Sequence, residues 1–178
     1  MARRVRMLGA GGHAKVAAEA WRSSGGEVVA LHDDDAGRHG RESLGIRIEG
    51  SLAAAIATAE PLHIAIGSNE ARRRIAAGIP DERFAAILHR HSVVSPTATV
   101  SAGTLVCAGA VVQACAEIGR HAIINSAAVV EHDVTIGDFV HIAPGARLGG
   151  GVEVGEGAMI GIGAIVLPGL SIGAGAIV

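Results

Sequence analysis

An aliphatic residue stands at every sixth position of this chain from Val94 to Val178, and the register never slips. A period of six fits neither the helical period of about 3.6 residues nor the two-residue alternation of a simple strand. It is typical of a solenoid in which each hexapeptide supplies one short strand and one tight turn, with the aliphatic side chain pointing inward. Three hexapeptides then complete one triangular coil, and successive coils stack. The fifteen positions are Val94, Val100, Val106, Val112, Ile118, Ile124, Val130, Ile136, Ile142, Leu148, Val154, Ile160, Val166, Ile172 and Val178.

The abrupt start of the hexapeptides predicts two domains, residues 1–91 and residues 92–178. With 26 Gly, two Phe and one Trp, the composition suits thin coils filled by Val, Ile and Ala rather than a core of aromatic rings. The run stops at Val178 in mid-repeat, although an exposed last coil is normally capped. We therefore expect the sequence to be truncated at its C-terminal end.

The first domain alternates between strand-like and helix-like segments, which predicts an α/β domain with a small parallel sheet. Strands are expected at residues 5–8, 27–31 and 62–66, with helices beginning near residues 16, 51 and 71. Sheets of this kind bind ligands at the carboxyl ends of their strands, where two glycine-led loops emerge. The candidate substrate-binding residues near these loops are Gly11, Gly12, His13, Asp33, Asp34, Gly67, Ser68 and Asn69.

The first loop, from Gly9 to Ala14, matches the Gly/Ala form of the dinucleotide fingerprint, with Asp33 and Asp34 about twenty residues further on. Such a match alone is weak, because the glycines also suit a tight turn that only packs a helix on the sheet. An NAD site is disfavoured because the domain is short for both mononucleotide halves. We favour one nucleotide, whose diphosphate meets the backbone N–H groups of the turn and whose base or ribose meets an aspartate.

Three arginines, Arg72, Arg73 and Arg74, follow the second loop. They lie close to that loop and its ligand, or they form only a solvated helix face.

Three histidines, His121, His132 and His141, depart from what a regular coil needs. Each of them, taken alone, also suits a solvated or packing residue. His132 is flanked by Glu131 and Asp133, and an adjacent carboxylate can hold an imidazole in the tautomer that a general base requires. His132 and His141 are half a coil apart, so they lie on different faces of one chain. Across a threefold axis, one face meets the neighbouring subunit, and we expect a homotrimer with active sites between subunits.

The chain resembles the sialic-acid O-acyltransferase/bacillosamine N-acetyltransferase family over essentially its whole length. That resemblance implies a small nucleotide-sugar-binding βαβ domain, a left-handed parallel β-helix of hexapeptide repeats, and the use of acetyl-CoA. Hexapeptides alone indicate only a superfamily, whereas the Gly-Gly-His turn combined with Glu-His-Asp is far more restrictive. The matching segments are residues 9–15, 32–34, 64–72, 88–90, 95–98, 125–126, 130–133, 137–141, 161–163 and 167–169.

Carried over to this sequence, the resemblance makes His132 the general base that takes a proton from the sugar amine. Asp133 orients it, although members that acetylate amino sugars often have Glu there. Asn125 helps to hold the sugar. A backbone N–H of the turn at residues 148–151 is the expected oxyanion donor.

The same resemblance places acetyl-CoA near His141, Gly150 and Ile162. His141 is expected to contact the thioester carbonyl or the pantetheine, and part of the adenosine site is expected beyond Val178.

The formal net charge of −2 gives no general attraction for nucleic acid or an anionic membrane. The N-terminal segment is basic, but its apolar run ends at Gly9, so neither a signal peptide nor a membrane span is predicted. Cys107 and Cys115 form no metal-binding or disulfide pattern, which favours the cytoplasm and no metal.

The sequence therefore predicts an acetyl-CoA-dependent N-acetyltransferase that acts on the amine of a nucleotide-linked 4-amino-deoxy sugar for surface glycan synthesis. Two alternatives stay open. One is O-acetylation of a sugar such as sialic acid, and the other is a non-catalytic nucleotide-binding solenoid.

Overall fold

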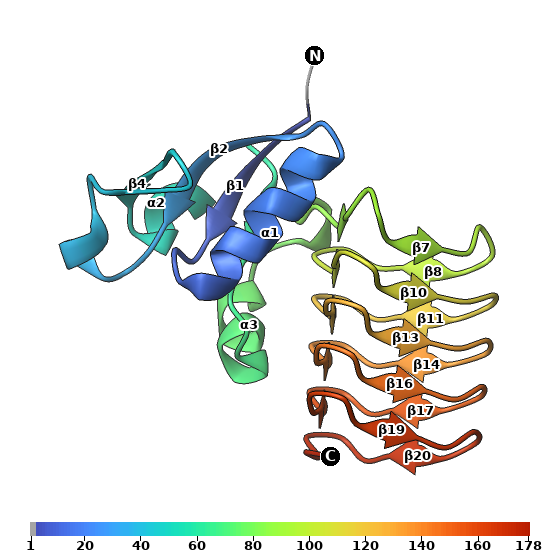
Figure 1. The fold of residues 1–178 in the computed structure, drawn as a ribbon. Coiled ribbons are helices and arrows are strands. Elements are labelled where there is room, and N and C mark those ends of the chain that lie inside the picture. The colour runs from blue at the N-terminus through green and yellow to red at the C-terminus, as the bar shows by residue number, and fades with distance from the viewer. Residues whose placement is uncertain (1–2) are drawn as a thin grey trace.

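The computed structural model describes residues 3–178 and shows an α/β domain beside one face of a long β-helix (Figure 1). The α/β domain holds three α-helices and two short 3₁₀ helices. They are α1 (Gly12–Ser23), α2 (Leu52–Ile56), α3 (Asn69–Ala76), η1 (Ala36–Arg38) and η2 (Asp81–Arg83). In the part of the chain that is described, no helix is long and apolar enough to cross a membrane.

The sheet of this domain has the strand order β3-β4-β2-β1-β5. Its strands are β1 (Arg4–Leu8), β2 (Glu27–His32), β3 (Glu42–Ser43), β4 (Ile46–Gly50) and β5 (Leu62–Ile64). The three predicted strands, β1, β2 and β5, are parallel as expected, β4 is a further parallel strand, and β3 runs antiparallel to β4. The β3–β4 hairpin was not predicted. Leu44 and Gly45 both have positive φ angles in its turn, and a leucine gives little sequence signal for that conformation.

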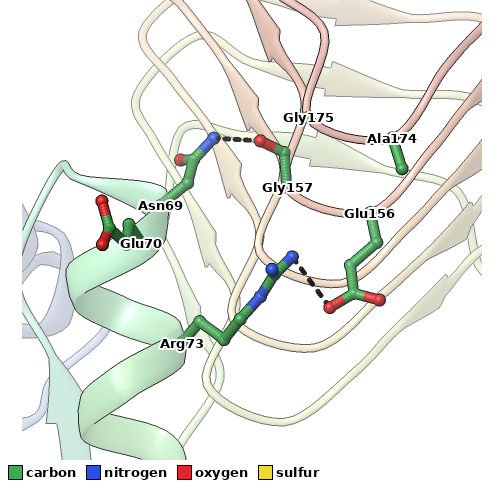
Figure 2. A pocket seen from close by; sticks show the side chains of 7 residues that line it. All are labelled: Asn69, Glu70, Arg73, Glu156, Gly157, Ala174 and Gly175. Carbon is green, nitrogen blue, oxygen red and sulfur yellow. Dashed lines mark hydrogen bonds and ion pairs between the residues drawn. The ribbon is translucent and has the colours of Figure 1, made fainter.

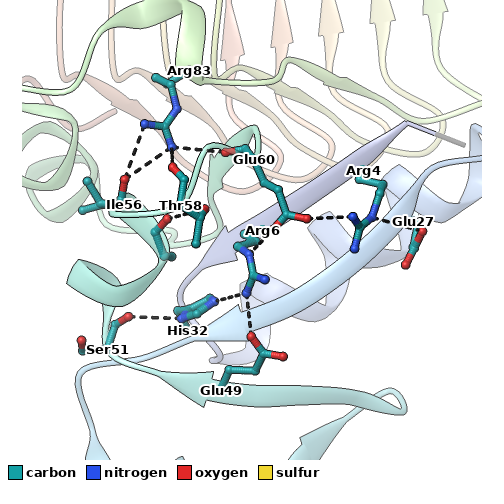
Figure 3. Close-up of polar contacts among 11 residues, drawn as sticks. Arg4, Arg6, Glu27, His32, Glu49, Ser51, Ile56, Thr58, Glu60 and Arg83 are labelled. Atoms are coloured by element: carbon teal, nitrogen blue, oxygen red, sulfur yellow. Dashed lines mark hydrogen bonds and ion pairs between the residues drawn. The ribbon is translucent and has the colours of Figure 1, made fainter.

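A polar network ties the central strand to its neighbours (Figure 3). Arg6 on β1 pairs with Glu60 and donates to Glu49 of β4 at 2.6 Å. His32 of β2 lies 3.2 Å from the carbonyl of Ser51 through Nδ1, so Nδ1 carries the proton and Nε2 accepts from Arg6 at 3.1 Å. The network fixes β1, β2 and β4 side by side below the ends of the strands where ligands bind.

The second part of the chain is a β-helix with three parallel sheets. The first holds β6 (Ile87–Leu88), β9 (Leu105–Val106), β12 (Ile123–Ile124), β15 (His141–Ile142) and β18 (Met159–Ile160). The second holds β7 (Val93–Val94), β10 (Val111–Val112), β13 (Val129–Val130), β16 (Arg147–Leu148) and β19 (Ile165–Val166). The third holds β8 (Thr99–Val100), β11 (Glu117–Ile118), β14 (Thr135–Ile136), β17 (Glu153–Val154) and β20 (Ser171–Ile172).

The hexapeptide prediction is confirmed in its register. Ile124 pairs with Ile142, one coil of 18 residues later, and the aliphatic positions fill one continuous core. Coil stacking already begins at β6, which pairs with β9. Leu88 of that strand continues the six-residue register one step back from Val94.

The three outer faces of the β-helix differ in chemistry. The face of β6, β9, β12, β15 and β18 packs against the α/β domain, and Leu105 joins a cluster with residues of α1. The face of β8, β11, β14, β17 and β20, here called the polar face, presents Thr99, Glu117, Thr135, Glu153 and Ser171. The remaining face, here called the apolar face, presents Val93, Val111, Val129, Arg147 and Ile165, and Ile165 is 70% exposed.

Candidate active site

A groove lies over the carboxyl ends of β1, β2 and β5. It consists of two adjoining hollows of about 290 and 220 Å³ that share Gly9, Asp33 and Ile66. Gly11 caps α1 without a side-chain bond, which leaves the backbone N–H groups of the first helical turn for a ligand. A Cβ added at Gly11 or Gly12 meets nothing within 4 Å, so the groove is open above this turn. The groove lies at the two loops for which a nucleotide site is expected, and the nucleotide itself stays a prediction.

The two aspartates at the groove also hold its loops in place. Asp33 accepts the N–H of Ala10 at 3.1 Å through one oxygen and the N–H of Asp35 at 3.0 Å through the other. Asp34 accepts the N–H of Leu52 at 3.0 Å, at the start of α2. Each carboxylate therefore offers a ligand only its remaining lone pairs.

The structure separates the three residues of the second loop. Gly67 lines the groove together with Gly11, Gly12 and His13. Ser68 caps α3 by accepting the N–H of Ala71 at 3.2 Å. Asn69 lines a different hollow, where its amide donates to the carbonyl of Gly157 at 3.0 Å (Figure 2). The same amide donates to the carbonyl of Ala158 at 3.1 Å.

His141, Asn125 and His13 gather where the groove reaches the β-helix. The Asn125 amide oxygen accepts the N–H of Ser126 at 2.8 Å, so its nitrogen faces His141 Nε2 at 2.9 Å. Nε2 therefore accepts, and the proton of the neutral ring is on Nδ1. The pKa of His141 is lowered to about 4, mainly by burial and to a smaller extent by the charge of Arg72.

The ring of His13 lies 6.3 Å from that of His141. Burial lowers its pKa to about 4, with smaller contributions from His141 and Arg72. Its Nε2 is buried without a hydrogen-bond partner among the described residues. A buried polar atom without a partner is costly, so this nitrogen is a candidate for contact with a ligand.

His132 and Asp133 lie on the corner between β13 and β14, and the side chain of His132 is 64% exposed. Asp133 Oδ2 is 2.7 Å from His132 Nδ1, which leaves Nε2 as the free nitrogen. The imidazole lies over Gly150 of the next coil, where an added Cβ would be only 2.6 Å from Cε1 and Nε2. An oriented imidazole with a free, exposed Nε2 can accept a proton from a substrate.

Within one chain, His132 does not reach the groove. His141 belongs to the face that the α/β domain covers, whereas His132 lies on the corner between the apolar and polar faces. Gly150 shares the corner of His132, and the exposed Ile162 lies on the opposite corner of the apolar face, between β18 and β19.

For His121 and Arg72 the structure decides between the alternatives that the sequence left open. His121 is a buried packing residue, stacked on Phe139 at 5.2 Å and edge-on to Phe84 at 4.5 Å. Arg72 is 1% exposed, so the solvated-face interpretation is wrong for this arginine. Arg72 instead lies against the second loop, where it donates to the carbonyls of Ile66 and Gly67. A run of three arginines hides which one faces inward.

The chain was compared with known families and structures. Residues 4–79 match the PglD N-terminal domain, and residues 115–150 match the bacterial transferase hexapeptide, six repeats. No curated protein matches the chain significantly. A mutant of perosamine N-acetyltransferase from Caulobacter crescentus, in complex with CoA and GDP-perosamine, is 37% identical with a TM-score of 0.88, covering 98% of this chain and 87% of that one.

Two further structures are similar. The acetyltransferase domain of PglB from Neisseria gonorrhoeae, in complex with acetyl coenzyme A, is 33% identical with a TM-score of 0.74, covering 100% of this chain and 91% of that one. WeeI from Acinetobacter baumannii is 22% identical with a TM-score of 0.74, and the match covers 97% of this chain and 94% of that one. At this identity it supports the fold alone. The chain therefore belongs to the family that the sequence resembled, the hexapeptide-repeat sugar acyltransferases with a PglD-type N-terminal domain and a left-handed β-helix.

Proposed function

We propose that this protein is an acetyl-CoA-dependent N-acetyltransferase that acetylates the amine of a nucleotide-linked 4-amino-deoxy sugar for surface glycan synthesis. The observation that carries the proposal is the His132–Asp133 pair, in which Nδ1 is bound at 2.7 Å and Nε2 is free. A separate groove with an open helix N-terminus suits a nucleotide diphosphate. The relative that is 37% identical binds CoA and GDP-perosamine, which makes a GDP-linked amino sugar the first substrate to test.

The reaction requires His132 to take one proton from the attacking amine and to return one to the departing sulfur. The neutral sugar amine attacks the thioester carbonyl, a C–N bond forms, and His132 Nε2 takes a proton from the attacking nitrogen. Asp133 stabilises the resulting imidazolium. The tetrahedral oxyanion then expels the CoA thiolate as the C–S bond breaks, and the imidazolium returns its proton to that sulfur. An amine needs only positioning and one base, which favours N-acetylation over the O-acetylation alternative.

The groove gives the other residues their proposed roles. Gly11 and Gly12 hold the diphosphate, and the sugar extends toward His13 and Asn125. His141 is expected near the thioester carbonyl. Because its Nε2 already accepts from the Asn125 amide, we propose that it acts by orienting that amide, whose second N–H is the donor left for a ligand.

We infer that the protein is a homotrimer and that a neighbouring subunit brings its His132 to the groove. The support is the apolar face, whose outward residues are mostly valine and isoleucine while the polar face carries Thr, Glu and Ser. An exposed apolar stripe on a triangular coil is a surface for a further copy in a closed threefold ring. His132 follows β13 of that face directly.

The decisive measurement is CoA release from acetyl-CoA across a panel of UDP-, GDP- and TDP-linked 4-amino sugars. We expect His132→Ala to lower kcat by roughly 100-fold or more with the trimer intact. His91→Ala is the matched control, because His91 is also an exposed β-helix histidine. Wild-type turnover by His132→Ala would exclude the mechanism. A product that hydroxylamine cleaves would indicate O-acetylation, and sugar-nucleotide binding without turnover would indicate a non-catalytic solenoid.

A further inference from the structure

Helix α3 faces the β-helix with one stripe of polar side chains, which are Asn69 and, three and four residues further on, Arg72 and Arg73. The two outer members are visible in Figure 2, where Asn69 donates to Gly157 and Arg73 pairs with Glu156 at 2.9 Å. Arg73 is 53% exposed, so its ion pair contributes little. The central member is Arg72, which is buried between the two domains.

The guanidinium of Arg72 is satisfied entirely by neutral oxygens. Nε donates to His121 at 2.9 Å, Nη1 to Gly67 at 2.9 Å and Ile66 at 3.2 Å, and Nη2 to Phe139 and Asn69 at 2.9 Å and Val140 at 3.3 Å. Five of these acceptors are backbone carbonyls, and the Asn69 acceptor is a side-chain amide oxygen. None of the ion pairs among residues 3–178 includes Arg72.

Burial lowers the pKa of Arg72 to about 10, so the side chain still carries its charge at neutral pH. A buried charge without a carboxylate is costly, and apolar side chains of similar volume often stabilise an interface at least as well. Adhesion between the domains is therefore a poor explanation for a charged residue at this position. The five N–H groups instead connect the loop at Ile66 and Gly67 to two coils of the β-helix.

These segments surround His141 on both sides. Gly67 lines the groove together with His13, whose ring lies 6.3 Å from that of His141, while Phe139 and Val140 directly precede His141 in the chain. His121 lies one coil below Phe139, so the guanidinium also joins two successive coils. One side chain thus connects the loop that lines the groove to the coil that carries His141.

We propose that Arg72 is a positioning residue for the sugar end of the active site, which holds the Gly67 loop and the coil of His141 in one register across the domain boundary. The proposal rests on the proposed function, since it assigns the groove to the sugar nucleotide. The charge of Arg72 has a second effect, because it adds to burial in keeping His13 and His141 neutral. Neutral rings retain an acceptor nitrogen for the Asn125 amide and for a sugar hydroxyl.

The test compares Arg72→Lys with Arg73→Lys in the full chain. Lysine keeps the charge but cannot supply five donors in a fixed fork. We expect Arg72→Lys to raise the KM for the GDP-linked amino sugar at least tenfold and to lower kcat about tenfold. The Kd of CoA, from calorimetry, should stay within twofold, because CoA lacks the thioester carbonyl that is expected near His141, and no acceptor of Arg72 lies on the corners that carry Gly150 and Ile162. Arg73→Lys should stay within twofold in every parameter.

A second variant separates positioning from folding. Arg72→Ala leaves space for a free guanidinium ion, and millimolar guanidinium should restore kcat/KM at least fivefold, whereas equal concentrations of sodium chloride should not. Unchanged kinetics in Arg72→Lys would overturn the proposal. So would an Arg72→Lys variant that loses affinity for CoA as much as for the sugar nucleotide, together with an Arg72→Ala variant whose kcat/KM guanidinium does not restore. The proposed function is judged separately, by whether the wild-type protein acetylates any sugar of the panel.

Discussion

Replacing Gly150 with alanine is expected to impair catalysis without weakening the fold. The added Cβ would lie 2.6 Å from Cε1 and Nε2 of His132, whereas carbon contacts settle near about 3.5 Å. The imidazole would have to move by about 1 Å. Because His132 is an exposed side chain and Gly150 does not have a positive φ, the ring can give way, and the free energy of unfolding should change by less than about 0.5 kcal/mol.

The expected kinetic loss follows from that displacement. A misplacement of about 1 Å can cost roughly 100-fold in rate, which corresponds to about 2.7 kcal/mol of transition-state stabilisation. The assay is thiol release from acetyl-CoA with the sugar nucleotide, and thermal unfolding is followed on the same samples. Gly173→Ala is the control, since its added Cβ meets nothing within 4 Å, and both measurements should match the wild type. A Gly150→Ala variant with more than a third of the wild-type kcat/KM would refute the placement of His132 as the base over this turn.

Three further perturbations test other parts of the structure. Asp133→Asn should keep the free energy of unfolding within about 0.5 kcal/mol, because Asn also tolerates the φ of +59°, but should lower kcat at least tenfold by removing the charge that stabilises the imidazolium. Burial lowers the pKa of His121 in the folded state to about 4. As the pH falls below about 6.5, the histidine is therefore protonated first in the unfolded state. The stability that is present above about pH 6.5 is lost between pH 6.5 and pH 4. In urea unfolding, His121→Asn should reduce the loss of stability between pH 7 and pH 5 by roughly 1–2 kcal/mol, and an unchanged loss would contradict this assignment. Val111→Asp should produce monomers in sedimentation experiments and abolish turnover, and an active trimer would count against the apolar face as the subunit interface.

The β-helix could be predicted closely from the sequence because its register is set by local repetition. Each aliphatic residue of the series has the same neighbours one coil above and below, so one rule fixes the whole core. The position of the groove could also be predicted, because parallel strands that end in glycine-led loops indicate a binding site at that edge of the sheet. The β3–β4 hairpin could not be predicted, since it depends on a turn with Leu44 and Gly45 at positive φ. The roles of Asn69 and Arg72 also depend on tertiary contacts, because one helix face docks on coils far along the chain.

The corners of the β-helix carry a signal that the aliphatic register alone does not reveal. Every sixth residue from Gly103 to Gly175 has a positive φ, and eight of these thirteen positions are glycine. A side chain at such a position costs roughly 1–2 kcal/mol, so a coil with no other task should use glycine. The exceptions form one unbroken run, Cys115, His121, Ala127, Asp133 and Phe139. This run encloses Asn125 and His132, ends just before His141, and includes the two aromatic residues whose carbonyls Arg72 binds. The coils thus depart from glycine at the corners whose carbonyls bind Arg72 and at the corner that holds the candidate base.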